Sequence, residues 1–413
     1  MSFKGQAIPT KARVKVLGVI MDKKLNYRAY VAEAAARAQE AALAVKRLKG
    51  LRPKATRQMV SAVVWPVADY ASPVWYPRSS DSLIRLLQNM QRKTAQAIIC
   101  SFRTVALPIA EAEAGVKQLR QRLLDQCLRF WIGIHTLNAA HPLAELRGAP
   151  PLRRFTSPLQ DMAVTFNSVD TSKIKAIDPA SIAPWRPPLR TVVKDKDEAL
   201  LEANEHLDNT VDIHTDASIR DEKAGIGVLI GPTTRLTQTV APADTTTITI
   251  TELIAIAAAL DLVNSATWDP GTSFRIFTDS KAAIHAIAWP RRDQNQAVVA
   301  IIYQLASSRH LTIHWIPGHA GHIGHDEADR LARDATSSDG PAPPEQTAVP
   351  LSVAIKRARQ QQFKPKMDSF AATTAGQFTK KIDRALPGKH TLLLYNGLSR
   401  KEAAILSLSL IHI

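Results

Sequence analysis

The chain has 413 residues, a formal net charge of +16 and a sequence pI near 9.9. This length exceeds what one hydrophobic core usually fills, so at least two domains are expected. The basic balance favours a polyanionic partner, although taken alone it also fits ribosomal or membrane-surface binding. The two cysteines, Cys100 and Cys127, form no C-x-x-C pair, which excludes a disulfide framework and a zinc site built from cysteines.

The sequence pattern favours neither a membrane span nor a secretory signal. No stretch approaches the roughly twenty apolar residues that a membrane span needs. The opening residues, MSFKGQAIPTKARVK, contain lysines but lack the apolar segment of a signal peptide. We therefore expect an intracellular protein, in the nucleus or cytoplasm, that is not secreted and has no membrane partner.

Residues 1–139 predict a mostly helical domain. A short apolar run, VKVLGVI, precedes a long alanine-rich helix that Gly50 ends after a basic last turn. Helical periodicity continues in the segments RQMVSAVVWPVADYASPVWY, SLIRLLQNMQRKTAQAIICSF and VKQLRQRLLDQCLRFWIGIHTL. Residues 140–208 are rich in proline, as in HPLAELRGAPPLRRFTSPL, and indicate an extended linker.

Residues 209–339 alternate short strands and helices. We expect strands at VDIHTDAS, AGIGVLI, RLTQTV, FRIFTD and LTIHWIP, and helices at TELIAIAAALDLV, SKAAIHAI, AVVAIIYQLAS and DEADRLARDA. Three strands followed by helices that alternate with two further strands predict an α/β domain with a mixed five-stranded sheet flanked by helices. Residues 340–413 form a basic carboxy-terminal tail with one expected helix, SVAIKRARQQQF.

Four acidic residues in this α/β domain stand where a simple core would not place them. They lie in the first strand, at the start of the first helix, at the end of the fourth strand and in the last helix: Asp216, Glu252, Asp279 and Asp329. A right-handed crossover would make the first and fourth strands parallel neighbours, which brings Asp216 close to Asp279. Such a carboxylate cluster suits hard divalent ions and predicts a two-metal phosphodiester site. Each acid taken alone is as readily a turn residue or a helix cap.

Four motifs in this order carry a resemblance: IHTDAS, TELIAIAAAL, RIFTDSKAAI and WIPGHAGHIGHDEADRLA. They resemble the successive motifs of the type 1 ribonuclease H family, in the form found inside retroelement polyproteins, over about residues 211–336. The resemblance implies an endonuclease that hydrolyses the RNA strand of RNA/DNA hybrids. It also implies that the four acids bind two Mg²⁺ ions, with Mn²⁺ possible. Water on one ion would attack the phosphate, and the other ion would stabilise the departing 3′ oxygen.

The same resemblance implies roles for residues around the carboxylates. His319, in the loop PGHAG, matches the histidine that assists proton transfer and product departure. Ser218, Ser280 and His325 are implied to contact the substrate, and RNA would be recognised by its 2′-hydroxyl groups. The family usually has an asparagine where this chain has His325.

The triplet His319, His322 and His325 also invites a zinc interpretation. Its spacing of three fits a helix face only roughly, and Gly321 and Gly324 between the histidines favour a loop. We therefore prefer the ribonuclease H assignment for this segment.

The amino-terminal segment carries a second resemblance. VLGVIMDKKLNYRAYVAEAAARAQEAALAVKRL, followed by SAVVWPVADYASPVWY, is similar to the thumb region after the polymerase palm in non-LTR (LINE-type) reverse transcriptases. The Tyr/Phe-x-Asp-Asp motif of the palm has no counterpart, so no polymerase activity is expected. The tail LYNGLSRKEAAILSLSLIHI resembles the segment after ribonuclease H in fungal elements. Together these resemblances imply a truncated retrotransposon reading frame.

Two alternatives to an active nuclease stay open. In the first, the chain is a catalytically silent, nucleic-acid-binding remnant, because residues 1–60 hold 14 Lys and Arg against 3 acids. The plainer explanation of that charge is a solvated helix face. In the second, the chain is a transposase or integrase of similar topology, which the Gly-His-Ala-Gly loop disfavours. None of the three predicts a small-molecule substrate, and the oligomeric state is unknown.

Overall fold

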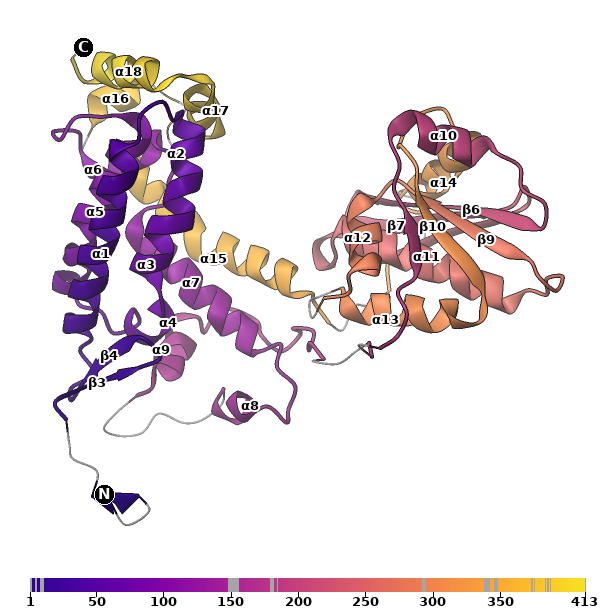
Figure 1. Ribbon diagram of the computed structural model, residues 1–413, viewed down its shortest axis with the longest axis horizontal. Coiled ribbons are helices and arrows are strands. Elements are labelled where there is room, and N and C mark those ends of the chain that lie inside the picture. Colours follow the sequence, from indigo (N-terminus) through magenta and orange to yellow (C-terminus); the bar gives the residue numbers. More distant parts are fainter. Residues whose placement is uncertain are drawn as a thin grey trace. The chain divides into compact units, whose positions relative to one another are not determined.

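Figure 1 shows a computed structural model of the chain. It describes residues 2–3, 6–7, 11–147, 156–178, 182–183, 185–291, 295–337, 342–344, 348–372, 374, 376–382, 384, 386 and 388–412. The chain divides into two compact units, which are described separately. The helical unit comprises Met1–Trp131, Leu146–Val169 and Ala358–Ile413, and the sheet unit comprises Ile132–Glu145 and Asp170–Arg357.

The chain before and after the sheet region is mostly helical, as expected for residues 1–139. Its strands are β1 (Ser2–Phe3), β2 (Gln6–Ala7), β3 (Arg13–Val16) and β4 (Val19–Asp22). Its helices are α1 (Arg28–Arg47), α2 (Pro53–Met59), α3 (Trp65–Asp69), α4 (Ser72–Trp75), α5 (Asp81–Ile99), α6 (Leu107–Glu113), α7 (Leu119–Ile134), α8 (Pro142–Leu146), α9 (Pro158–Thr165), α15 (Leu351–Ala372), α16 (Gln377–Ile382), α17 (Lys389–Gly397) and α18 (Arg400–His412), with a π-helical turn at Val60–Val64.

Helices α1 and α5 pack along each other in the core of the helical unit. Alanines recur on the buried face of α1, among them Ala34, Ala38 and Ala42, and their small side chains let the two helices approach closely. Leu87 and Met90 of α5 are fully buried against this face. The alanine-rich sequence is therefore used for close helix packing.

A buried polar network joins α3, α5, α6 and α7 in the same unit. Both carboxylate oxygens of Asp69 accept hydrogen bonds from Arg122, at 2.6 and 3.0 Å, and Arg122 also donates to Gln91. Gln91 in turn donates to Glu111 at 2.9 Å. Burial raises the pKa of Glu111 to about 7 despite this hydrogen bond. Since buried polar groups need matched partners, the network fixes how these helices meet.

The sheet unit contains a six-stranded mixed sheet in the order β5-β10-β9-β6-β7-β8. The strands are β5 (Arg190–Val192), β6 (Thr210–Arg220), β7 (Lys223–Ile230), β8 (Thr234–Pro242), β9 (Ser273–Thr278) and β10 (His310–Trp315). Strands β6, β7 and β8 form an antiparallel meander, and β9, β10 and β5 add in parallel beyond β6. The expected α/β architecture is confirmed, with six strands rather than five. The sixth, β5, lies within residues 140–208, where the proline content predicts a linker.

Helices cover both faces of this sheet (Figure 1). They are α10 (Lys196–Asn204), α11 (Ile248–Ser265), α12 (Lys281–Ala288), α13 (Gln296–Leu305) and α14 (Ile323–Asp334). Helices α11, α12 and α13 pack on the face that contains Ile213, Ile276 and Ile313, whereas α14 and α10 pack on the opposite face. Because side chains alternate along a strand, Asp216 of β6 lies on the α14 face.

Helix α11 is, in the part of the chain that the structure describes, the one helix long and apolar enough to cross a membrane. Half of it is buried within the sheet unit. Leu253, Ile256 and Leu260 are almost fully buried in the core on this face of the sheet. Its apolar character is therefore accounted for by packing on the sheet.

Two glycines of β7 let α14 lie directly on the sheet. A Cβ atom at Gly227 would overlap the carbonyl oxygen of Ala328, and one at Gly225 would overlap Ala335. Since no larger residue fits at either position without moving the helix, these glycines set the distance between α14 and β6. They thereby position the side chains that α14 presents to Asp216.

Candidate active site

Strands β6 and β9 bring the first two predicted carboxylates together. They run parallel, with His214 opposite Phe277, so Asp216 and Asp279 lie at the same level two residues further on. A carboxylate oxygen from each and a ring nitrogen of His325, on α14, all lie within 4.8 Å of one another. The predicted proximity of Asp216 and Asp279 is confirmed, and a histidine joins them.

The buried carboxylates of the cluster have too few positively charged partners to balance their own charge. Asp216 is 7% exposed, and burial, aided by the charges of Asp279 and Asp329, raises its pKa to about 7, although His325 opposes the rise. Glu252, from α11, is 4% exposed, and burial followed by the charges of Asp216 and Asp279 raises its pKa well above its usual value. Its Oε2 atom has no hydrogen-bond partner among the described residues. These are the properties of a site that a divalent cation would neutralise.

Replacing Asp216 with Asn is expected to stabilise the protein when divalent ions are absent. The folded state keeps the proton of Asp216 up to about pH 7, whereas the unfolded chain loses it near the usual value of 3.8. The contribution of this group to stability therefore falls as the pH rises from about 4 to 7. We expect Asp216→Asn to gain about 1–3 kcal/mol in EDTA at pH 8, and less at pH 5. Thermal unfolding of both chains at the two pH values measures this. An equal or lower Tm for the variant at pH 8 would show that the carboxylate is compensated.

His325 lies inside the carboxylate cluster rather than at its edge. It is 2% exposed, and its Nε2 atom is 3.9 Å from Oδ2 of Asp279. Burial lowers the pKa of this imidazole, but the interactions with Asp279 and Asp216 outweigh burial and leave the pKa raised. The sequence predicts a substrate contact for His325, whereas the structure directs its ring toward the carboxylates of Asp216 and Asp279.

The other two histidines of the triplet have different partners. His322 caps α14, because its Nδ1 atom accepts a hydrogen bond from the backbone N–H of His325 at 3.3 Å. Its Nε2 atom lies 3.2 Å from the carbonyl oxygen of Ala203 and must donate, since a carbonyl only accepts. The Nδ1 atom of His319 is 3.5 Å from Asp329. Among the described residues the triplet does not form a common ligand group, which speaks against the zinc interpretation.

Asp329 and His319 form the exposed side of the site. His319 is 74% exposed, and its φ of 53° places it in the left-handed region within the loop before α14. Asp329 is 17% exposed and lies 2.5 Å from Arg333, one turn further along α14. The four motifs do not include Arg333 and so do not predict this contact. The spacing of four residues between Asp329 and Arg333 on the expected helix could have indicated it.

The predicted substrate contacts, Ser218 and Ser280, flank the carboxylates. Ser218 is buried on β6, two residues beyond Asp216 on the same face. The hydroxyl of Ser280 caps α12 by accepting a hydrogen bond from the backbone N–H of Ala283 at 3.2 Å. Trp315 opens the fourth motif, although no role is predicted for it from the sequence. It donates from Nε1 to the backbone carbonyl of Asp279 at 3.0 Å and so anchors the end of β9.

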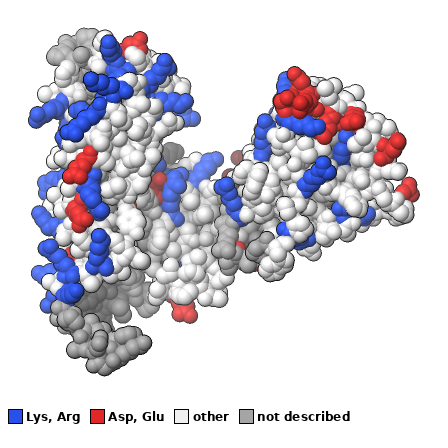
Figure 2. Space-filling view, in the orientation of Figure 1, with Lys and Arg blue, Asp and Glu red and all other residues white. Residues whose placement is uncertain are grey.

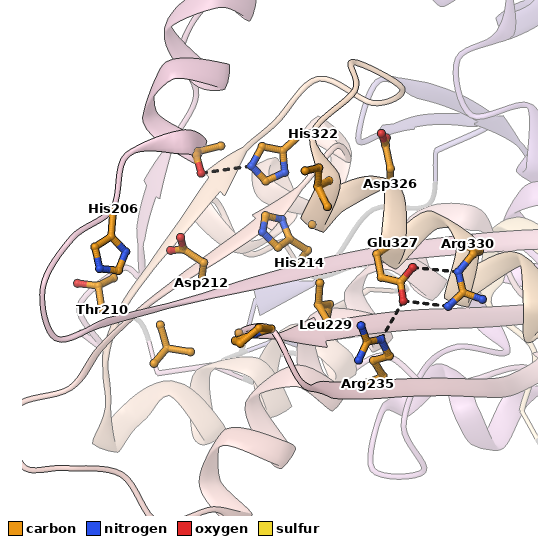
Figure 3. A pocket seen from close by; sticks show the side chains of 16 residues that line it. His206, Thr210, Asp212, His214, Leu229, Arg235, His322, Asp326, Glu327 and Arg330 are labelled. Atoms are coloured by element: carbon orange, nitrogen blue, oxygen red, sulfur yellow. Dashed lines mark hydrogen bonds and ion pairs between the residues drawn. The ribbon is translucent and has the colours of Figure 1, made fainter.

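A cleft of about 970 Å³ lies beside the cluster but does not include Asp216 or Asp279 (Figure 3). Its charged groups are largely paired, because Glu327 accepts hydrogen bonds from Arg235 at 2.8 Å and from Arg330 at 2.9 Å. Burial lowers the pKa of His214, in the cleft wall, to about 3, so its ring is neutral. The carboxylate cluster, with its unpartnered Glu252 oxygen, is therefore a stronger candidate for the active site than this cleft.

The comparisons with known proteins concern the sheet unit. The family model for RNase H matches residues 208–337. One similar solved structure is the N-terminal RNase H domain of a Mycobacterium tuberculosis protein fused to maltose-binding protein, at 23% identity, covering 31% of this chain and 99% of that one, with a TM-score of 0.26. Another is LC11-RNase H1, isolated from compost by a metagenomic approach, at 22% identity, covering 31% and 96%, with a TM-score of 0.26. The family match supports an RNase H domain at residues 208–337.

Proposed function

We propose that the RNase H domain is an endonuclease that hydrolyses the RNA strand of RNA/DNA hybrids with two divalent ions, expected to be Mg²⁺. The observation that carries this is the convergence of Asp216 and Asp279, whose charges also act on the buried carboxylate of Glu252 and help to raise its pKa. These three residues and Asp329 would hold the ions. Bound divalent ions activate a water nucleophile and stabilise charge on the departing oxygen.

The remaining groups fit supporting roles in this proposal. Arg333 contacts the carboxylate of Asp329 and would orient it. His319 is exposed and lies next to Asp329, where its imidazole can reach a bound substrate. The side chain of Asp279 is 33% exposed, so the cluster opens to the surface, where an extended polymer can reach it.

The direct test is cleavage of a labelled RNA/DNA hybrid by the purified full chain with and without Mg²⁺. Single-stranded RNA and duplex DNA serve as substrate controls. The proposal expects cutting of the RNA strand in the hybrid alone, and only with a divalent ion. Cleavage that persists in EDTA, or equal cleavage of single-stranded RNA, would contradict it.

We also propose that the helical unit binds nucleic acid, as the resemblance of its first helices to a reverse-transcriptase thumb implies. The helical unit holds 35 Lys and Arg against 12 Asp and Glu, whereas the sheet unit holds 18 against 25. Figure 2 shows Lys and Arg across the visible face of the helical unit, and Asp and Glu gathered over α10 of the sheet unit. Because an acidic nuclease domain repels its polyanionic substrate, a basic unit in the same chain would supply affinity.

The charge is most concentrated where α1 ends and α2 begins. We call this surface the basic end; it consists of exposed residues within 46–54 and one from α18: Lys46, Arg47, Lys49, Arg52, Lys54 and Lys401. No acidic residue occurs between Glu40 and Asp69. Arg400 donates hydrogen bonds to the backbone carbonyls of Lys46 and Leu48, which ties α18 to the end of α1. Segments distant in the sequence therefore share this surface.

Neutralising the basic end is expected to weaken hybrid binding and its salt dependence. Changing the five basic residues within 46–54 to Gln should reduce the slope of log K against log salt by about 0.9 for each phosphate that the variant no longer neutralises. Fluorescence anisotropy with a labelled hybrid over a salt series measures the slope. Substitution is preferable to deleting residues 1–60, because α1 fills the core of the helical unit with residues such as Val31 and Ala38.

A matched control separates the basic end from net charge. It changes five exposed basic residues in and on either side of the β3–β4 hairpin to Gln: Lys11, Arg13, Lys15, Lys23 and Lys24. The two variants have the same net charge. If their slopes fall equally, the basic end has no special role in binding.

A further inference from the structure

The carboxylate cluster contains a nitrogen donor that an all-carboxylate site would lack. His325 lies in the first turn of α14, and its Nε2 atom is 3.9 Å from Oδ2 of Asp279. The side chain is 2% exposed, and Nδ1 has no hydrogen-bond partner among the described residues. Oε2 of Glu252, also buried, is likewise without a partner in the described structure. Two buried polar side chains at the cluster thus have unused donor or acceptor capacity.

The surroundings of His325 argue against a purely structural role. The cap of α14 is already provided by His322, which accepts a hydrogen bond from the backbone N–H of His325. The distance of 3.9 Å to Asp279 exceeds the usual 2.7–3.2 Å of a direct hydrogen bond. Two ligand atoms that each lie about 2.1 Å from one ion can be up to about 4.2 Å apart, so this separation suits a shared ion.

We propose that Nε2 of His325 is a metal ligand, together with Asp216 and Asp279, and that it makes the site favour Mn²⁺ over Mg²⁺ more than carboxylates alone would. Imidazole nitrogen suits transition-metal ions, whereas Mg²⁺ binds oxygen donors and keeps several waters. This inference rests on the proposed function in placing the ion at the catalytic carboxylates. It assigns to His325 a role in the choice of metal.

Electron paramagnetic resonance of Mn²⁺ tests the ligand directly. Mn²⁺ is added to the untagged full chain, the loss of the free-ion signal gives its Kd, and Mg²⁺ competition gives the Kd for Mg²⁺. Electron spin-echo modulation of the bound Mn²⁺ then reports whether ¹⁴N is coupled to the ion. We expect ¹⁴N coupling in the unaltered chain. In His325→Asn we expect no coupling, and a preference for Mn²⁺ over Mg²⁺ that is lower by on the order of tenfold.

His322→Asn is the matched control. It removes a histidine three residues away, and asparagine is also a good helix cap, so α14 should keep its start and the ¹⁴N coupling should persist. Bound Mn²⁺ without ¹⁴N coupling in the unaltered chain would overturn the proposal, and this outcome does not depend on whether any variant folds. Coupling that survives in His325→Asn, or an unchanged Mn²⁺ preference there, would overturn it as well.

The outcomes also distinguish a failure of the histidine-ligand inference from a failure of the proposed nuclease function. A chain that cleaves the hybrid with Mg²⁺ but shows no ¹⁴N coupling rejects the histidine ligand alone. A chain that couples Mn²⁺ to ¹⁴N through His325 but cleaves nothing rejects the nuclease and supports the ligand. Absence of any Mn²⁺ binding would overturn the histidine ligand, while Mg²⁺-dependent cleavage would still decide the nuclease.

Discussion

Asp279→Asn is expected to lower Mg²⁺-dependent cleavage of the hybrid by about 10²–10³-fold or more. Asparagine keeps the shape of the side chain but removes one negative charge from the cluster that would hold the ions. Asp279 contributes to the raised pKa of both Asp216 and Glu252, so its loss weakens the attraction of the whole site for a cation. Hybrid binding should stay the same or become tighter, because one negative charge no longer repels the phosphates.

Single-turnover cleavage and anisotropy binding, measured on the same preparation, test both parts of this prediction. Asp261→Asn is the matched control, because it removes an exposed carboxylate from α11 of the same unit without touching the cluster. That variant should cleave like the unaltered chain. Cleavage by Asp279→Asn at the rate of the control would remove Asp279 from the proposed site.

The proximity of Asp216 and Asp279 follows from the sequence because it depends only on strand order and handedness. A crossover from the first to the fourth expected strand makes them parallel neighbours, and both acids fall at the same end. No detail of side-chain packing enters that argument. The resemblance to ribonuclease H motifs implies that Glu252 and Asp329 act with these two acids, and the family match to residues 208–337 supports the domain.

Strand β5 is missed because its formation depends on a partner and not on local pattern. Arg190–Val192 is only three residues long, which is too short to show an alternation of polar and apolar side chains. It also follows two prolines, which favour a loop. It forms by pairing Thr191 with Ile313 of β10. Such a short edge strand is stabilised by an existing sheet, which composition in a single window does not describe.

The orientation of His325 could not be predicted from its place in the motif. A histidine where the family has asparagine suggests a substrate contact, and its ring direction depends on how closely α14 approaches β6 and β7. That approach is set by Gly225 and Gly227, about a hundred residues earlier in the chain. A glycine within a strand indicates a close backbone approach, but the sequence alone does not say which element approaches.

Gly227→Ala is therefore expected to destabilise the sheet unit and to displace part of the site. The added Cβ would overlap the carbonyl oxygen of Ala328 and lie against the backbone of Ala332, atoms that cannot rotate away as a side chain could. Overpacking of this kind costs about 1–3 kcal/mol. For a unit of this size, each kcal/mol lowers Tm by about 2–4 °C. Because α14 carries Asp329, its displacement by about 1 Å should also reduce cleavage on the order of 10²-fold.

Calorimetry and single-turnover cleavage at a temperature where the variant remains folded separate the loss of stability from the displacement. Gly133→Ala is the control, because an added Cβ there meets nothing within 4 Å. It should leave cleavage unchanged and should not lower stability, since Gly133 lies in α7, where alanine favours the helix. If Gly227→Ala lost stability but cleaved normally when folded, α14 would tolerate a shift and Asp329 would not need its observed position. If Gly227→Ala kept both its stability and its cleavage rate, the contact between α14 and β7 would not set the geometry of the site. A folded variant with slow cleavage would show that a glycine outside the motifs positions a carboxylate within them.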